Sequence, residues 1–77
     1  MKIELRQTDL RIMVKINVGG MDEMFVVRRT PTWFKVGRLD HNGYAIGKHH
    51  HCRTLNAALH SAVNRSFVRF ESKMKGV

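Results

Sequence analysis

The sequence of 77 residues lacks several features that mark specialised classes of protein. Its single cysteine, Cys52, cannot form a disulfide within the chain, and a lone free thiol favours an intracellular, cytoplasmic protein. One proline and six glycines are too few for a collagen-like chain or a linker. There is no long apolar run, so we expect neither a membrane span nor a signal peptide. These absences predict one small globular domain over residues 1–77.

Acidic residues are scarce as well. Six Asp and Glu oppose 14 Lys and Arg, and the formal net charge is +8. Between Met24 and Phe70 the one acid is Asp40, so most of the positive excess lies in this interval. Surface charge is normally mixed in sign, so a stretch of one sign predicts a polyanionic partner. The alternative is a surface that serves only solubility.

The first half of the chain has the pattern of β-strands. Five apolar residues recur at strict period two from Leu10 to Val18, which is the period of a strand with one buried face; the positions between them are Arg11, Met13, Lys15 and Asn17. Residues Glu23 to Arg29 are rich in strand-forming types, and Gly19-Gly20 between the two segments fits a tight turn. Ile3 and Leu5 also alternate with polar residues and fit a short additional strand at the N-terminus.

A second hairpin and a helix follow. Trp33 to Leu39 and Tyr44 to Lys48 are predicted strands, and Asn42-Gly43 between them favours a type I′ turn. Thr54 is a suitable N-cap for a helix. The apolar residues after it recur near every 3.6 positions and form one stripe: Leu55, Leu59, Ala62, Val63, Phe67, Phe70 and Met74.

This order of elements predicts an α+β domain. An antiparallel sheet of two β-hairpins, with room for an extra N-terminal strand, packs on one long C-terminal helix. The opposite face of the sheet is expected to stay open.

Two groups of cations are candidates for contacts with a polyanion. Arg65, Arg69 and Lys73 lie four residues apart on the helix, where like charges cost about 0.2–0.5 kcal/mol per pair. This row is consistent either with an edge of the helix that contacts the phosphates of a nucleic acid or with a face that is simply exposed to solvent. The strands supply further cations and Trp33, which fits either base stacking or a place in the core. The full set of candidate binding residues is Arg11, Lys15, Arg28, Arg29, Trp33, Lys35, Arg38, Lys48, Arg53, Arg65, Arg69 and Lys73.

The run Lys48-His49-His50-His51-Cys52 contains good ligands for zinc, but its spacing is unfavourable. On a strand, His49 and His51 share a face that His50 does not, and no CxxC or HxxxH pair is present. We expect a solvated loop that leads into the helix, with no metal and no cofactor. With six acids in one small domain, the sequence gives no basis for a catalytic Ser-His-acid triad, so we expect this protein not to be an enzyme.

The segment from Tyr44 onward, YAIGKHHHCRTLNAALHSAVNRSF, joins a strand to a Thr-Leu helix start and an Ala-Ala-Leu first turn. It resembles small phage accessory proteins. The order of strands followed by a helix is similar to the arm-binding domains of tyrosine recombinases and to plant AP2-type domains. In those folds a three-stranded sheet enters the DNA major groove and the helix braces it. The Arg and Trp pattern of AP2-type domains is not matched, so no binding residues are transferred.

Two functional hypotheses result. The first is a non-enzymatic domain that binds DNA or RNA through a basic sheet face and helix row. The second is suggested by the resemblance to phage proteins, which include inhibitors of host defence of the anti-CRISPR type. Such an inhibitor would dock on an acidic host protein or a ribonucleoprotein. Either protein could also gain stability as a homodimer, because so small a domain buries little surface.

Overall fold

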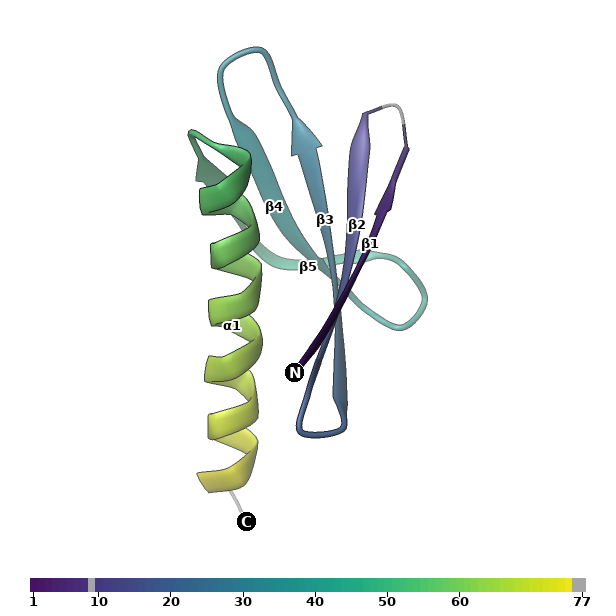
Figure 1. The fold of residues 1–77 in the computed structure, drawn as a ribbon, viewed down its shortest axis with the longest axis vertical. Helices are drawn as coiled ribbons and strands as arrows, with labels where there is room; N and C mark the ends of the chain where they lie inside the picture. Colours follow the sequence, from purple (N-terminus) through teal and green to yellow (C-terminus); the bar gives the residue numbers. More distant parts are fainter. Residues whose placement is uncertain (9, 76–77) are drawn as a thin grey trace.

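The structure is a computed structural model that describes residues 1–8 and 10–75. It consists of five strands followed by a helix: β1 (Lys2–Gln7), β2 (Arg11–Val18), β3 (Met21–Arg29), β4 (Phe34–Leu39), β5 (Ala45–Cys52) and α1 (Leu55–Lys75). The strands form one antiparallel sheet in the order β1-β2-β3-β4-β5. Helix α1 lies along one side of this sheet (Figure 1). The predicted α+β class is confirmed, and the two predicted hairpins, with the N-terminal strand, form a continuous five-stranded meander.

The turn between β2 and β3 has two residues, both with positive φ: 57° at Gly19 and 82° at Gly20. Val18 pairs directly with Met21, as a type I′ hairpin requires. A Cβ added at Gly19 would overlap the ring of Phe70 in α1. This turn therefore fixes the strand register and lets the helix approach the sheet closely.

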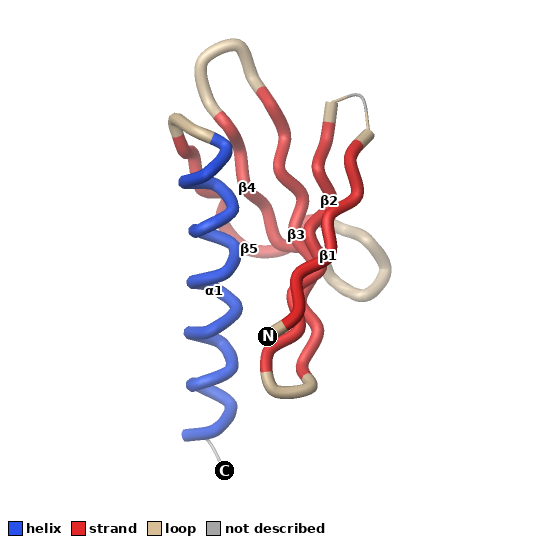
Figure 2. The backbone as a smooth tube through the Cα atoms, viewed as in Figure 1, coloured by secondary structure: helices blue, strands red, loops and turns tan. Residues whose placement is uncertain are grey.

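The turn between β4 and β5 differs from the predicted type I′ form. Gly43 has φ 87°, but Asn42 does not have a positive φ. Asp40 O accepts from Gly43 N at 3.0 Å, and Asp40 Oδ1 accepts from the backbone N–H groups of Asn42 and Tyr44. The pattern is that of a three-residue loop with a type I turn and a left-handed glycine. The side chain of Asp40 selects it, and the loop projects away from α1 (Figure 2).

The histidine tract also differs from its prediction, since His49, His50 and His51 lie within strand β5 and not in a loop. The pairing of β5 with β4 is irregular between Val36 and Arg38. Gly47, with φ 72°, lies in this irregular stretch. The bulge lets β5 continue along β4 as far as Cys52.

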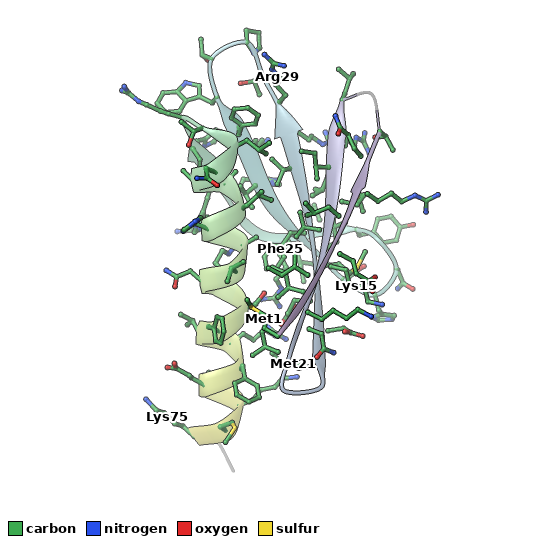
Figure 3. All side chains as sticks on the ribbon, in the orientation of Figure 1. Met1, Lys15, Met21, Phe25, Arg29 and Lys75 are labelled. Carbon is green, nitrogen blue, oxygen red and sulfur yellow. The ribbon has the colours of Figure 1, made fainter. Side chains whose placement is uncertain are left out.

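The core lies between the sheet and α1. On the helix-facing side, β2, β3 and β4 contribute six buried apolar residues: Val14, Ile16, Val18, Phe25, Val27 and Val36. The labelled Phe25 lies between the two layers in Figure 3. The innermost helix residues are Ala58, Ala62 and Ser66, whose small side chains let the helix approach closely.

The buried face of the helix is thus rotated about the helix axis relative to the predicted apolar stripe. Leu59, Val63 and Phe70 pack beside the core, whereas Leu55, Phe67 and Met74 are exposed. Within the described part of the chain, no helix is long and apolar enough to cross a membrane.

Candidate nucleic-acid interface

The open face of the sheet is the side turned away from α1. Strand alternation places on it the residues that lie between the buried ones, and Lys15 projects to this side in Figure 3. On β1 to β4 this face carries six cations and two acids: Lys2, Glu4, Arg6, Arg11, Lys15, Asp22, Arg28 and Lys35.

Four of the basic side chains on this face form a line across the strands, which we call the cationic row: Arg11, Arg28, Lys35 and His51. Arg11 pairs with Arg28, Arg28 with Lys35, and Lys35 with His51, each directly across one strand interface. Three spacings between strands give the row a length of about 14 Å. The two-residue turn at Gly19-Gly20 makes Arg11 and Arg28 a non-hydrogen-bonded pair, in which side chains are closest.

The cationic row has no acidic partner among the described residues. The two acids of the open face are engaged elsewhere: Glu4 with Lys2 at 3.2 Å and Asp22 with Lys15 at 3.9 Å. Like charges directly opposite one another destabilise a sheet. The other four of the six cations on β1 to β4 make no ion pair with a described carboxylate.

A shallow depression lies beside the cationic row. Its lining includes four apolar residues, Met13, Val26, Leu39 and Ala45, and the cationic side chains of Arg11, Arg28 and Lys35. Val26 is only 7% exposed, so the row lies beside a packed apolar surface. This surface offers contacts to the sugars or bases of a bound strand.

His49 covers the gap left by Gly37 on the same face. A Cβ at Gly37 would be 2.9 Å from Nδ1 of His49, so glycine is needed for this contact. Slight loss of hydration against the sheet, together with the charges of Lys35 and of His51, lowers the pKa of His49, whose side chain is exposed. An anion bound here would oppose that effect by favouring the charged imidazole.

The predicted helix row does not form a free basic edge. Arg69 Nε lies 2.7 Å from Glu23 Oε1, and Arg38 Nε lies 3.6 Å from Glu23 Oε2. Glu23 is buried on the helix-facing side of β3, so its carboxylate draws both arginines into the space between the sheet and α1. Arg38, a candidate for the basic sheet face, thus lies on the helix-facing side of the sheet and not on the open face.

Arg65 also turns toward the sheet. Its Nη2 donates to the backbone oxygen of Lys48 at 3.4 Å, and its guanidinium lies 5.5 Å from the ring centre of Phe25. Burial and the charge of Arg38 lower the pKa of Arg65, and Glu23 partly offsets this. Neither Arg65 nor Arg69 is a freely solvated cation, which corrects their predicted position away from the packed side of the helix.

The remaining predicted site residues are dispersed. Trp33, just before β4, is 39% exposed and stacks on Arg53, whose Cζ lies 5.3 Å from the ring centre. Arg29 lies on the helix-facing side at the end of β3 (labelled in Figure 3). Lys73 is exposed in the last turn of α1. Of the predicted set, the structure brings together Arg11, Arg28 and Lys35, while Lys15 lies farther along the same face, beyond Met13.

Two residues of the interface were missed in the sequence. Arg6 lies on the open face opposite Met13, and His51 continues the cationic row. Period-two alternation along β1 was the available signal for Arg6. On the other face, His50 Nδ1 lies 3.2 Å from Ser61 Oγ. Among the described residues, no three His, Cys, Asp or Glu side chains gather as metal ligands.

Comparison of the chain with protein-family models, with curated proteins and with solved structures gives no match.

Proposed function

We propose that this protein is a non-enzymatic nucleic-acid-binding domain that contacts phosphates through the open face of its sheet. The observation that carries the proposal is the cationic row, in which Arg11, Arg28 and Lys35 oppose one another directly. No acid among the described residues neutralises them. Such a row is unfavourable in the free protein and becomes favourable when a polyanion lies across it.

The shape of the open face indicates how the nucleic acid would lie. Five strands at a spacing of about 4.8 Å make a sheet about 19 Å wide, whereas the major groove of B-DNA is about 12 Å wide. The whole sheet is too wide to enter the groove in the way that the resemblance to three-stranded domains implies. In the proposed complex, the open face lies on the phosphate backbone, and the apolar residues that line the depression contact sugars or unpaired bases.

A salt titration tests the proposal. Binding to a labelled duplex and to a single strand of the same sequence would be measured by fluorescence anisotropy between 50 and 300 mM salt, about the range over which phosphate contacts weaken strongly. Three or four phosphate contacts predict that log K falls with log salt at a slope of about −3 for a duplex. A slope near zero, or no binding at low salt, would overturn the proposal.

A pull-down separates nucleic acid from the second hypothesis, an inhibitor of the anti-CRISPR type that docks on a host protein. The tagged protein would be incubated with bacterial lysate, with and without nuclease. Loss of all partners after nuclease treatment supports direct binding to nucleic acid. A stoichiometric protein that is retained after complete digestion favours docking and contradicts the proposal.

A further inference from the structure

Strand β1 is an uncovered edge of the sheet. All six of its residues are exposed, and among the described elements it contacts β2 but not α1. Ile3 and Leu5 point to the helix side, yet they are 43% and 57% exposed. An exposed edge strand with regular pairing on its inner side is a template for another strand. The other edge differs, because β5 carries a bulge that interrupts its outline.

The backbone groups that β1 offers can be assigned from its turn. Thr8 N donates to Arg11 O at 2.8 Å, so the N–H and C=O of Thr8 point toward β2. Backbone groups alternate along a strand, so those of Arg6, Glu4 and Lys2 also point toward β2. The groups of Ile3, Leu5 and Gln7 therefore point outward and are available to a neighbouring strand.

The charges on β1 select one pairing with a second copy of the same strand. An antiparallel pair centred on Glu4 places Glu4 opposite Glu4 of the second copy, and Lys2 opposite Arg6, which is unfavourable. A pair centred on Leu5 places Glu4 opposite Arg6 twice. It joins Leu5 to Leu5 and Ile3 to Gln7 through outward-facing backbone groups, so that residues 3–7 of each strand overlap. A pair centred on Ile3 opposes Lys2 and Glu4, but it overlaps only residues 2–4 of each strand.

We propose that β1 is a homodimer interface in which two copies pair antiparallel about Leu5. The result is a continuous ten-stranded sheet. The two-fold axis of such a pair is perpendicular to the sheet, so both helices lie on one side and both cationic rows on the other. The two half-exposed leucines cover each other on the helix side. This proposal does not depend on nucleic-acid binding and is tested without it.

Charge reversal on β1 gives a direct test by sedimentation equilibrium at low salt over a range of protein concentrations. The wild-type protein is expected to approach twice the mass of one chain as its concentration rises. Glu4→Arg alone and Arg6→Glu alone each place like charges opposite one another, and each should remain monomeric. An equimolar mixture of the two variants, and the double variant E4R/R6E, should both dimerise because opposite charges again meet.

Lys2→Glu is the matched control. In the pairing about Leu5, Lys2 faces Thr8 and the substitution should leave dimerisation unchanged. In the pairing about Ile3, Lys2 faces Glu4, and the substitution would abolish the dimer. Far-UV circular dichroism verifies that each variant is folded. A wild-type protein that is monomeric at every concentration, a mixture that stays monomeric, or a dimer lost in Lys2→Glu overturns the proposal.

Discussion

Replacing Arg28 by glutamine changes stability and binding in opposite directions if the cationic row is a binding site. Arg28 is the centre of the row, directly opposite both Arg11 and Lys35. Glutamine keeps most of the side-chain length and removes the charge. The free protein then loses two like-charge contacts, whereas a bound polyanion loses one phosphate contact.

The size of both effects follows from the register. Each like-charge pair directly across a sheet costs about 0.2–1 kcal/mol, so relief of two pairs should raise the free energy of unfolding by several tenths of a kcal/mol or more. For a domain of this size, 1 kcal/mol corresponds to about 4–8 °C in Tm. On the binding side, loss of one phosphate contact should make the slope of log K against log salt shallower by about 0.9 on a duplex.

Thermal unfolding and a salt titration of Arg28→Gln measure the two effects on one sample. Lys73→Gln is the matched control, because Lys73 is exposed in the last turn of α1 and far from the open face. It removes the same charge and should change neither the salt slope nor Tm appreciably. The reasoning is refuted if Arg28→Gln lowers Tm, or if Lys73→Gln weakens binding as much as Arg28→Gln does.

Three further substitutions examine the fold and the pH response. Gly19→Ala should destabilise the protein more than Gly20→Ala in urea unfolding. Both positions have positive φ, at a cost of about 1–2 kcal/mol for alanine, but only at Gly19 does the added carbon meet a helix ring. Equal losses would contradict this contact. Glu23→Gln should lower the free energy of unfolding by about 2 kcal/mol. This is less than the loss expected for a fully buried ion pair, because its arginine partners are partly exposed. Glu71→Gln on the exposed helix surface should leave the free energy of unfolding nearly unchanged. The pKa of His49 is lowered in the folded protein, so the unfolded state binds more protons as pH falls through about 6.5, and stability should decrease there. A bound polyanion should favour the charged form of His49, so its affinity should rise as the pH falls from about 7.5 to 5.5. His49→Gln should reduce this rise. An affinity that does not change with pH would show that no anion lies near this ring.

The centre of the cationic row could be derived from the sequence, although it was not. A two-residue turn at Gly19-Gly20 pairs Val18 with Met21, and counting back along both strands places Arg11 opposite Arg28. Lys35 could not be added in the same way. Its register depends on the connection at Thr30, whose hydroxyl accepts from Trp33 N at 2.9 Å and donates to Trp33 O at 2.8 Å.

The helix arginines show where pattern reasoning fails. An amphipathic pattern assigns arginine to solvent, because the pattern records the residue type and not its partner across the core. Here Glu23 occupies a helix-facing position in β3, two residues before the fully buried Phe25. A buried carboxylate requires a cation nearby, and Arg69 and Arg38 supply it from two elements. Strand alternation already placed Glu23 on the core side, so the signal was present in the sequence.

The histidine tract could not be placed from its spacing alone. The bulge at Gly47 changes how residues of β5 match those of β4, and a bulge has no fixed sequence signature beyond glycine. The bulge brings His49 over Gly37 and His51 opposite Lys35 on the open face.

Cations on the two faces of the sheet differ in whether they have partners within the described chain. This contrast is the strongest support for the proposed ligand on the open face. On the helix side, the arginines that reach the core find a buried carboxylate, a backbone carbonyl or an aromatic ring. On the open side, three cations stand opposite one another with no acid among the described residues. A sequence that served only solubility would gain by placing glutamate at one of these positions, because a cross-strand ion pair would stabilise the sheet. This like-charge repulsion on the open face is what the proposed polyanion would relieve.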